Sequence, residues 1–205
     1  MPVGRLAAPF KELPFVLLLL GIAISTYGIF IPITYLAVQA FQEAHMSDEM
    51  SQYLIAIFNG ASLFGRLAAG WGADKIGRWN MFIIACTVSG ICEFAVWIPA
   101  TKASIDIGFA IMFGFASGAF MALSGALPVS VSPLPEIGYR LGVVFLAISI
   151  PALTMAPIGG AVLQASATHG WRDVKIFGGV MCIAGSSIVL VSRLLYTEKK
   201  LLKVF

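Results

Sequence analysis

The sequence predicts an all-α membrane protein with six transmembrane helices. Of its 205 residues, 59% are apolar and 11% are charged, and the mean hydropathy is +0.93. Because soluble globular domains contain about 25% charged residues, this composition lies outside the soluble class. Six apolar stretches, each near the roughly 20 residues needed to cross a bilayer core of about 30 Å, are separated by short connections.

The six predicted spans cover most of the chain, and the connections between them are polar or contain proline. The spans are residues 13–41, 52–73, 81–99, 105–131, 138–163 and 174–195. Such short connections require neighbouring spans to be antiparallel, so we expect a single six-helix domain over residues 1–205. The first apolar stretch follows Arg5 and Lys11 as a secretory signal would, but it is far longer than a signal core and is expected to be retained.

The first span contains two candidate substrate contacts, Tyr27 and Phe30. Tyr27 lies about fourteen residues from the start of the span, so the usual placement of aromatic residues at the membrane interface does not account for it. Helix packing is the equal alternative for both side chains. Gly28 and Pro32 allow this helix to bend.

The second span carries an arginine. Arg66 precedes Asp74, where the next connection starts, by eight residues, which places it about 12 Å inside the membrane. A membrane-embedded arginine costs about 2.5–3.5 kcal/mol on insertion scales and usually faces a water-filled cavity or a partner. Gln52, Asn59 and Ser62 recur with Arg66 at helical spacing, which predicts one polar face lining a cavity.

An alternative interpretation is that the Arg66 side chain reaches the lipid headgroups. The polar face continues beyond Arg66 toward the other side of the membrane, where it cannot reach the same headgroups, and this favours a cavity. Ala61, Gly65, Ala69 and Ala73 repeat every four residues on a different face. Small residues at this spacing predict close helix packing in lipid.

The third and sixth spans contain the cysteines. Cys86, Cys92 and Cys182 all fall inside apolar stretches, so we expect free buried thiols, no disulfide framework and no metal site. Apart from Arg66, Glu93 is the only charged residue well inside an apolar stretch. Its position near the outer end of the third span favours a structural role over proton transfer.

The distribution of lysine and arginine predicts the orientation. With a cytoplasmic N-terminus, the basic residues on the inner side are Arg5, Lys11, Lys75, Arg78, Arg140, Lys199, Lys200 and Lys203, and those on the outer side are Lys102, Arg172 and Lys175. We therefore expect a multi-pass protein with both termini in the cytoplasm. As a separate expectation, the plasma membrane is favoured over the vacuolar membrane.

Several sequence motifs resemble one transporter family. Residues 70–78, GWGADKIGR, resemble the G-x-L-A-D-R-x-G-R loop of the major facilitator superfamily, with Gly72 in place of the usual leucine. The segments EIGYRLG and APIGGAVL resemble the eleventh helix of that superfamily, and MFGFASGAF resembles the tenth. Together these motifs cover nearly the whole chain, in order, as a C-terminal half of helices seven to twelve. The stretches YGIFIPITYL and GRLAAGWGADKIGRWN are similar to the fungal branch of the monocarboxylate transporter family.

The resemblance implies one half of a major facilitator bundle and secondary transport by alternating access, with a substrate site near the midplane between the two halves. In monocarboxylate transporters an arginine of helix eight meets the substrate carboxylate, and Arg66 occupies the matching position. Ser62 replaces an aspartate that takes part in proton coupling in animal members, which leaves proton coupling open. The implied partners are a small organic anion such as a monocarboxylate, the lipid bilayer, and an N-terminal six-helix half or a second copy. No cofactor and no nucleic acid is implied.

The resemblance also implies a conformational role for the connection after the second span. Asp74, Lys75, Gly77 and Arg78 are expected to brace the inner helix ends in one transport state, where charge pairs break and reform. At the start of the fifth span, Glu136 stands four residues before Arg140, which is a favourable spacing for an ion pair. This pair is assigned to gating with the others.

Other functional classes fit less well. An intramembrane enzyme would need a nucleophile, an acid–base pair or a metal cluster, whereas His45 and His169 lie in outer connections away from other ligands. A channel would need rings of repeated polar residues, which the sequence does not show. A truncated, non-transporting protein that associates with or regulates a full-length transporter stays open as an alternative, because it would share every feature except completeness.

Overall fold

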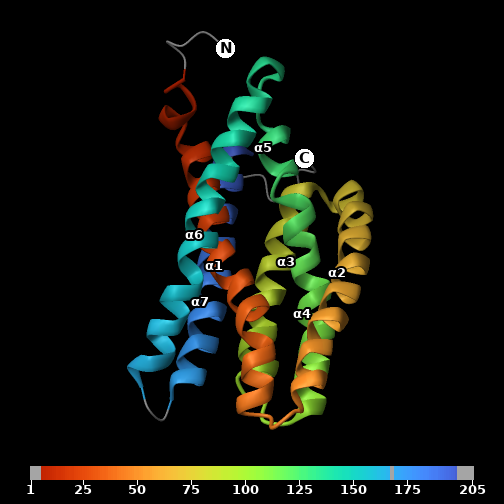
Figure 1. Ribbon diagram of the computed structural model, residues 1–205. Coiled ribbons are helices and arrows are strands. Elements are labelled where there is room, and N and C mark those ends of the chain that lie inside the picture. The colour runs from red at the N-terminus through yellow and green to blue at the C-terminus, as the bar shows by residue number, and fades with distance from the viewer. Residues whose placement is uncertain (1–5, 167–168, 198–205) are drawn as a thin grey trace.

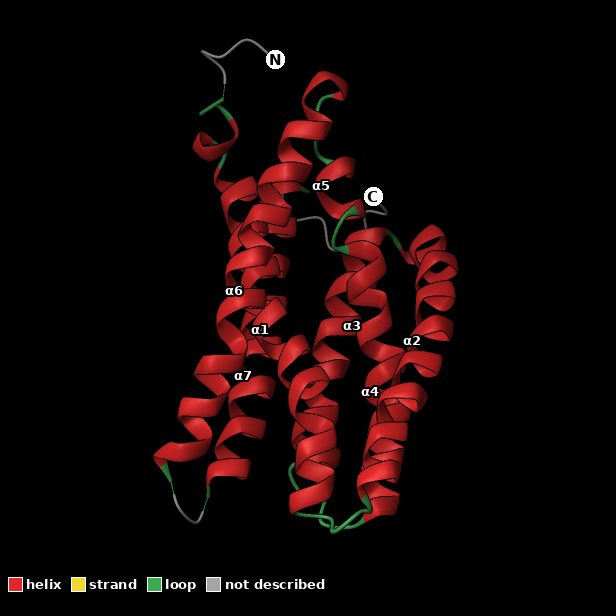
Figure 2. Cartoon of the chain, viewed as in Figure 1, coloured by secondary structure: helices red, strands yellow, loops and turns green. Residues whose placement is uncertain are grey.

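The computed structural model, which describes residues 6–166 and 169–197, contains six long helices, each antiparallel to the next one in the chain (Figure 1). They are α1 (Leu13–Gln42), α2 (Asp48–Ile76), α3 (Arg78–Cys92), α4 (Ala103–Leu123), α6 (Ile137–Ala165) and α7 (Gly170–Tyr196). A π-helical segment, Glu93–Trp97, extends α3. All six are long and apolar enough to cross a membrane, and Figure 2 shows no strand in the described part of the chain. The predicted fold class is confirmed.

The two ends of the bundle carry different connections (Figure 1). The end where α1 begins and α7 finishes, which we call the terminal end, also holds the α2–α3 turn and the connection from α4 to α6. The opposite end, which we call the distal end, holds the α1–α2, α3–α4 and α6–α7 connections. Four of the basic residues used to predict orientation, Arg5, Lys199, Lys200 and Lys203, lie outside the described residues.

Most helices are longer than the apolar stretches that predict them. The N-terminus of α2 is capped by Ser47, whose Oγ accepts a hydrogen bond from the Met50 backbone N–H at 3.3 Å. At its other end α2 continues to Ile76, so the expected 74–80 loop is reduced to Gly77. This residue has φ 90°, a conformation that glycine adopts without a Cβ clash.

The expected fourth span, 105–131, differs from the structure. Helix α4 ends at Leu123, and a short helix α5 (Ala126–Ser130) and a 3₁₀ turn (Leu134–Glu136) lead into α6. The sequence from 128 to 135 contains three prolines, which lack the backbone N–H needed to continue a helix. Apolar composition alone extended the predicted span past this break.

Close backbone contacts hold the bundle together. Helix α1 packs mainly against α7 and α2 against α4, while α3 lies between α7 and α4, and α6 covers one side of α1. A Cβ added to Gly118 of α4 would overlap the carbonyl oxygen of Ser62, and one added to Gly65 would overlap that of Phe115. Glycine at these positions lets the α2 and α4 backbones touch, as is common for helices packed in lipid.

Candidate functional site

Arg66 lies on an exposed face in the middle part of α2. It is ten residues from the end of α2 at Ile76, or about 15 Å along the helix. Its side chain is exposed, and within the described residues no carboxylate is within ion-pair distance of its guanidinium. Asn59 and Gln52 are exposed on the same side of the helix. The structure therefore presents an uncompensated cation on a polar stripe that the rest of this bundle does not cover.

Ser62 differs from the expectation that it shares this exposed stripe. It is 2% exposed and lies on the face of α2 that packs against α4, next to Gly118. The physical reason is angular: at 100° per residue Ser62 lies at the border between the polar stripe and the small-residue face. Gly65, Ala69 and Ala73 of that face are buried, as the close-packing pattern predicted, and Ala61 is half-buried.

Tyr27 and Phe30 of α1 are half-buried, and the contacts of Tyr27 are with other helices of the same bundle. The Tyr27 hydroxyl forms a hydrogen bond with Thr154 Oγ1 of α6 at 2.7 Å. Its ring also makes an edge-on contact with Phe177 of α7, with 6.4 Å between the ring centroids. Tyr27 thus packs with α6 and α7, whereas Arg66 lies on the α2–α4 side, and no contact joins these two candidate residues.

The α2–α3 turn at the terminal end exposes three of the four residues assigned to it. Asp74, Lys75 and Arg78 are exposed, and Lys75 Nζ lies 3.7 Å from the centroid of the Trp71 ring. Asp74 forms no ion pair within the described residues. The turn is instead fixed by Gly77 and by Trp79, whose Nε1 donates a hydrogen bond to Ser130 Oγ of α5 at 3.2 Å.

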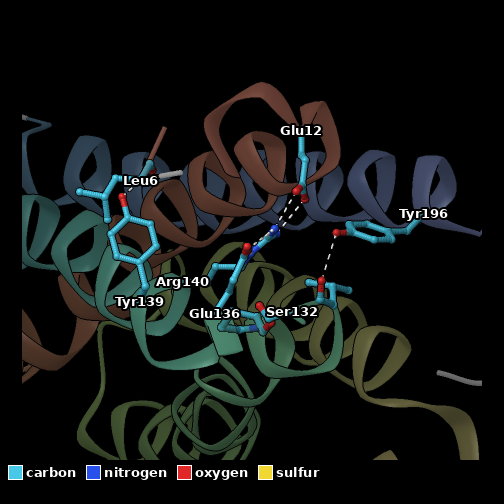
Figure 3. A network of polar contacts seen from close by, with 9 residues as sticks. Leu6, Glu12, Ser132, Glu136, Tyr139, Arg140 and Tyr196 are labelled. Atoms are coloured by element: carbon cyan, nitrogen blue, oxygen red, sulfur yellow. Dashed lines mark hydrogen bonds and ion pairs between the residues drawn. The ribbon is translucent and has the colours of Figure 1, made fainter. Parts of the chain in front are cut away.

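Arg140 is the centre of a buried ionic cluster at the terminal end (Figure 3). Its side chain is 3% exposed and donates to both carboxylate oxygens of Glu12, at 2.7 and 2.6 Å, and to Glu136 at 3.0 and 2.9 Å. The predicted Glu136–Arg140 pair is therefore present. Glu12 lies just before α1, so the cluster joins the start of α1 to the start of α6. Beside it, the Tyr139 hydroxyl donates to the Leu6 carbonyl at 2.8 Å.

A second ionic cluster lies at the distal end, and no sequence motif indicates its residues as a site. Lys175 of α7, 2% exposed, donates to Glu43 Oε2 at 2.6 Å. Asp106, in the first turn of α4, is fully buried beside them, and neither of its carboxylate oxygens has a hydrogen-bond partner within the described residues. Lys175 lies at the end expected to face outward, and its side chain is enclosed by the bundle. The burial of Asp106 could be inferred from the sequence only through its helical spacing with Phe109, Ala110 and Phe113, which are all buried.

Glu93 is also fully buried, at the first residue of the π-helical segment. Cys182 Sγ of α7 donates a hydrogen bond to its Oε1 at 3.4 Å, and Oε2 has no partner in the described chain. A Cβ added to Gly178 of α7 would overlap Oε2, so the carboxyl fits against a glycine. The three cysteines are free and buried, as expected.

The sequence pattern of the Major Facilitator Superfamily matches residues 15–205. The chain belongs to this superfamily. The Fujikurins efflux protein of Gibberella fujikuroi is 71% identical over 205 residues, which are all of this chain and 44% of that protein. The MFS transporter asaE of Aspergillus flavus is 48% identical over 197 residues, 96% of this chain and 44% of the relative. The Agnestins efflux protein AgnL12 of Paecilomyces divaricatus is 28% identical over 179 residues, 87% of this chain and 40% of the relative.

The major facilitator chain thus spans less than half the length of the curated relatives it matches. These relatives are fungal, as the sequence motifs suggested. They give no support to the narrower expectation of a monocarboxylate substrate.

Proposed function

We propose that the chain forms one six-helix half of a secondary transporter that moves a small organic anion across the membrane by alternating access. The observation that carries the proposal is Arg66, a cation in the middle part of a helix long enough to span the bilayer, exposed and without a carboxylate partner among the described residues. Its planar guanidinium suits bidentate binding of a carboxylate.

The energetics favour a cavity in front of Arg66. Facing lipid, an arginine near the bilayer centre costs about 2.5–3.5 kcal/mol on insertion scales, and exposed Asn59 would add to this cost. A second six-helix bundle would replace lipid by a water-filled cleft. In this proposal the bundle is an N-terminal half or a second copy, and the substrate anion lies between Arg66 and that bundle.

The low burial of two helices, α2 itself and α6, is consistent with such a partner. In their most apolar stretches, only 28% of the residues of α2 and 17% of those of α6 are buried, compared with 56% for α1 and for α4. Helices α2 and α6 are thus the least covered elements of the bundle. Tyr27 and Phe30 are proposed to extend the substrate contact from α1.

The proposal also includes the direction of transport and the side of the membrane on which the terminal end lies. Two relatives are named as efflux proteins, for fujikurins and for agnestins, which supports export of an organic product. We propose that the protein lies in the plasma membrane with its terminal end in the cytoplasm, so that the α2–α3 turn and the Arg140 cluster are on the inner side. The residues that we propose to act in gating there are Asp74, Lys75, Gly77, Arg78, Glu136 and Arg140.

A chimera tests this proposal. The matched segment of the Gibberella relative is replaced by this chain, and export of labelled carboxylates and of their uncharged amide counterparts is measured from loaded vesicles. We expect export of at least one carboxylate and not of its amide. Arg66→Ala should reduce that export at least tenfold at equal membrane expression, and Arg66→Lys should restore only part of it.

The matched control is Lys102→Ala, which removes an exposed cation at the distal end and should leave export unchanged. Full export by the Arg66→Ala chimera would refute the assigned role of Arg66. If the chimera transports nothing, although it reaches the membrane and lowers export by a co-expressed intact relative, then the regulatory alternative is the correct one.

A further inference from the structure

The distal ionic cluster contains one cation and two carboxylates from three different helices. Lys175 comes from α7, Glu43 from the C-terminal end of α1, and Asp106 from the first turn of α4. Lys175 is ion-paired to Glu43 at 2.6 Å, and the Glu43 side chain is 31% exposed. Asp106 is fully buried and accepts no hydrogen bond from any described residue.

Gln39 of α1 is a neutral neighbour that interacts with Asp106, but not with the geometry of a full hydrogen bond. Its Nε2 donates instead to Glu43 Oε2 and to the Ala100 carbonyl, both at 3.2 Å. The Gln39 Oε1 accepts from Trp97 Nε1 at 3.1 Å. The side chain that could have donated to Asp106 therefore has its hydrogen bonds elsewhere.

Few charges act on Asp106. Lys175 and Glu43 are the charged side chains that interact with it electrostatically. On α2, the buried residues at this end, Ser51 and Leu54, carry no titratable group. On the π-helical segment, Glu93 is held by Cys182 instead. Asp106 thus depends on Lys175, which it shares with Glu43.

An ionised Asp106 is unfavourable in this arrangement. Burying a carboxylate without a partner is strongly unfavourable. The positive end of the α4 dipole offsets only a small part of this cost, although Asp106 lies in the first helical turn. The dipole compensates only part of this cost, and with Lys175 paired to Glu43 the burial of Asp106 favours its neutral acid form.

We propose that Glu43, Lys175 and Asp106 form a binding site for one proton at the distal end. In the described arrangement the proton is on Asp106 and Lys175 pairs with Glu43. In the second state the proton is on Glu43, and Lys175 pairs with ionised Asp106. The O–H bond on Asp106 breaks, one forms on Glu43, and the ammonium changes its acceptor, so both states have zero net charge.

Exchange with solution takes place through Glu43. This residue is partly exposed and borders a cavity of about 360 Å³ at the distal end, which His169, Trp171 and Arg172 also line. The position of the proton determines which helix is tied to α7: α1 in the described state and α4 in the other. The site therefore couples protonation to the contacts of three helix ends, independently of the proposed substrate site at Arg66.

Infrared spectroscopy of the purified full chain in detergent tests the proton site without any transport assay. The carbonyl stretch of protonated carboxyls is recorded at mildly acidic pH, where burial favours the protonated form of Asp106. Asp106→Asn should remove the signal of one protonated carboxyl per chain. Glu43→Gln should remove the same signal, because Lys175 then turns to Asp106 and ionises it. Glu49→Gln, which changes an exposed acid of α2 at the same end, should remove nothing.

Each of the two variants has an outcome that would overturn the proposal. An unchanged carboxyl signal in folded Asp106→Asn would show that Asp106 is ionised and would overturn the proposal. A signal that persists in Glu43→Gln would show that the two acids do not share Lys175, and would also overturn it. Glu43 is partly exposed, so its variant provides a test even if Asp106→Asn does not fold. Because neither readout involves substrate, these outcomes are separate from those of the transport experiment.

Discussion

The Arg140 cluster makes a quantitative prediction about the terminal end of the bundle. Replacing Arg140 with glutamine removes a side chain that is 3% exposed and makes four hydrogen bonds to two carboxylates. It also removes the packing of the guanidinium over the Phe15 ring, 5.0 Å from its centroid. Both carboxylates then lose their cation, but to different extents, because Glu12 is 40% exposed and Glu136 is 16% exposed.

The magnitude follows from these exposures. Breaking a fully buried ion pair costs about 3–5 kcal/mol, and an exposed pair is worth about 0.2–1 kcal/mol. Glu12 regains water when Arg140 is removed, so its pair lies between these limits, at about 1.5 kcal/mol. Adding the loss for the less exposed Glu136, Arg140→Gln should lower the free energy of unfolding by about 3 kcal/mol.

A double-mutant cycle isolates the Glu12–Arg140 pair. Unfolding in mixed detergent micelles is measured for Glu12→Gln, Arg140→Gln and the double variant. We expect a coupling energy of about 1.5 kcal/mol, slightly more than tenfold in the unfolding constant. Additive effects, with coupling below about 0.3 kcal/mol, would refute the view that this bidentate pair joins the start of α1 to α6.

Two further predictions concern helix packing and topology. Gly118→Val should lower the free energy of unfolding by about 2–3 kcal/mol, because the new side chain overlaps the Ser62 carbonyl. Gly108→Val is the control and should be nearly neutral, because a Cβ at Gly108 meets nothing within 4 Å. Equal effects of the two substitutions would contradict the close α2–α4 contact. In a chain without the three native cysteines, an impermeant maleimide added to intact cells should label a cysteine at Lys102 and not one at Asp74, and the reverse pattern would contradict the cytoplasmic placement of the terminal end.

The features that the sequence predicted well depend on a single helix at a time. The number of spans follows from apolar length, and the buried face of α2 follows from small residues repeated at helical spacing, of which Gly65, Ala69 and Ala73 are buried. Ser62 was misplaced because it lies at the edge of that face. There, a small angular difference decides between the cavity and the neighbouring helix.

Contacts between distant parts of the chain could not be predicted from one sequence. The residues of the distal cluster are at positions 43, 106 and 175, and each one alone resembles an ordinary charge near a helix end. These residues come together only because three helix ends lie at the distal end and α1 packs against α7. The periodicity of one sequence does not predict this tertiary arrangement. The Glu136–Arg140 pair was predictable because a spacing of four residues across the start of one helix fixes its geometry, whereas the approach of Glu12 to the same cluster was not.

A comparison of Arg66 with two buried cations, Arg140 and Lys175, supports the role proposed for Arg66. Arg140 and Lys175 are buried, and each is compensated by carboxylates of this chain at 2.6 to 3.0 Å. Arg66 lies deeper along its helix than either and yet has no carboxylate partner in the described bundle. A charge kept for stability would be paired in the same way, since the chain pairs the other two. This contrast supports the proposal that the compensating group for Arg66 comes from outside these helices, as an anion bound between two bundles.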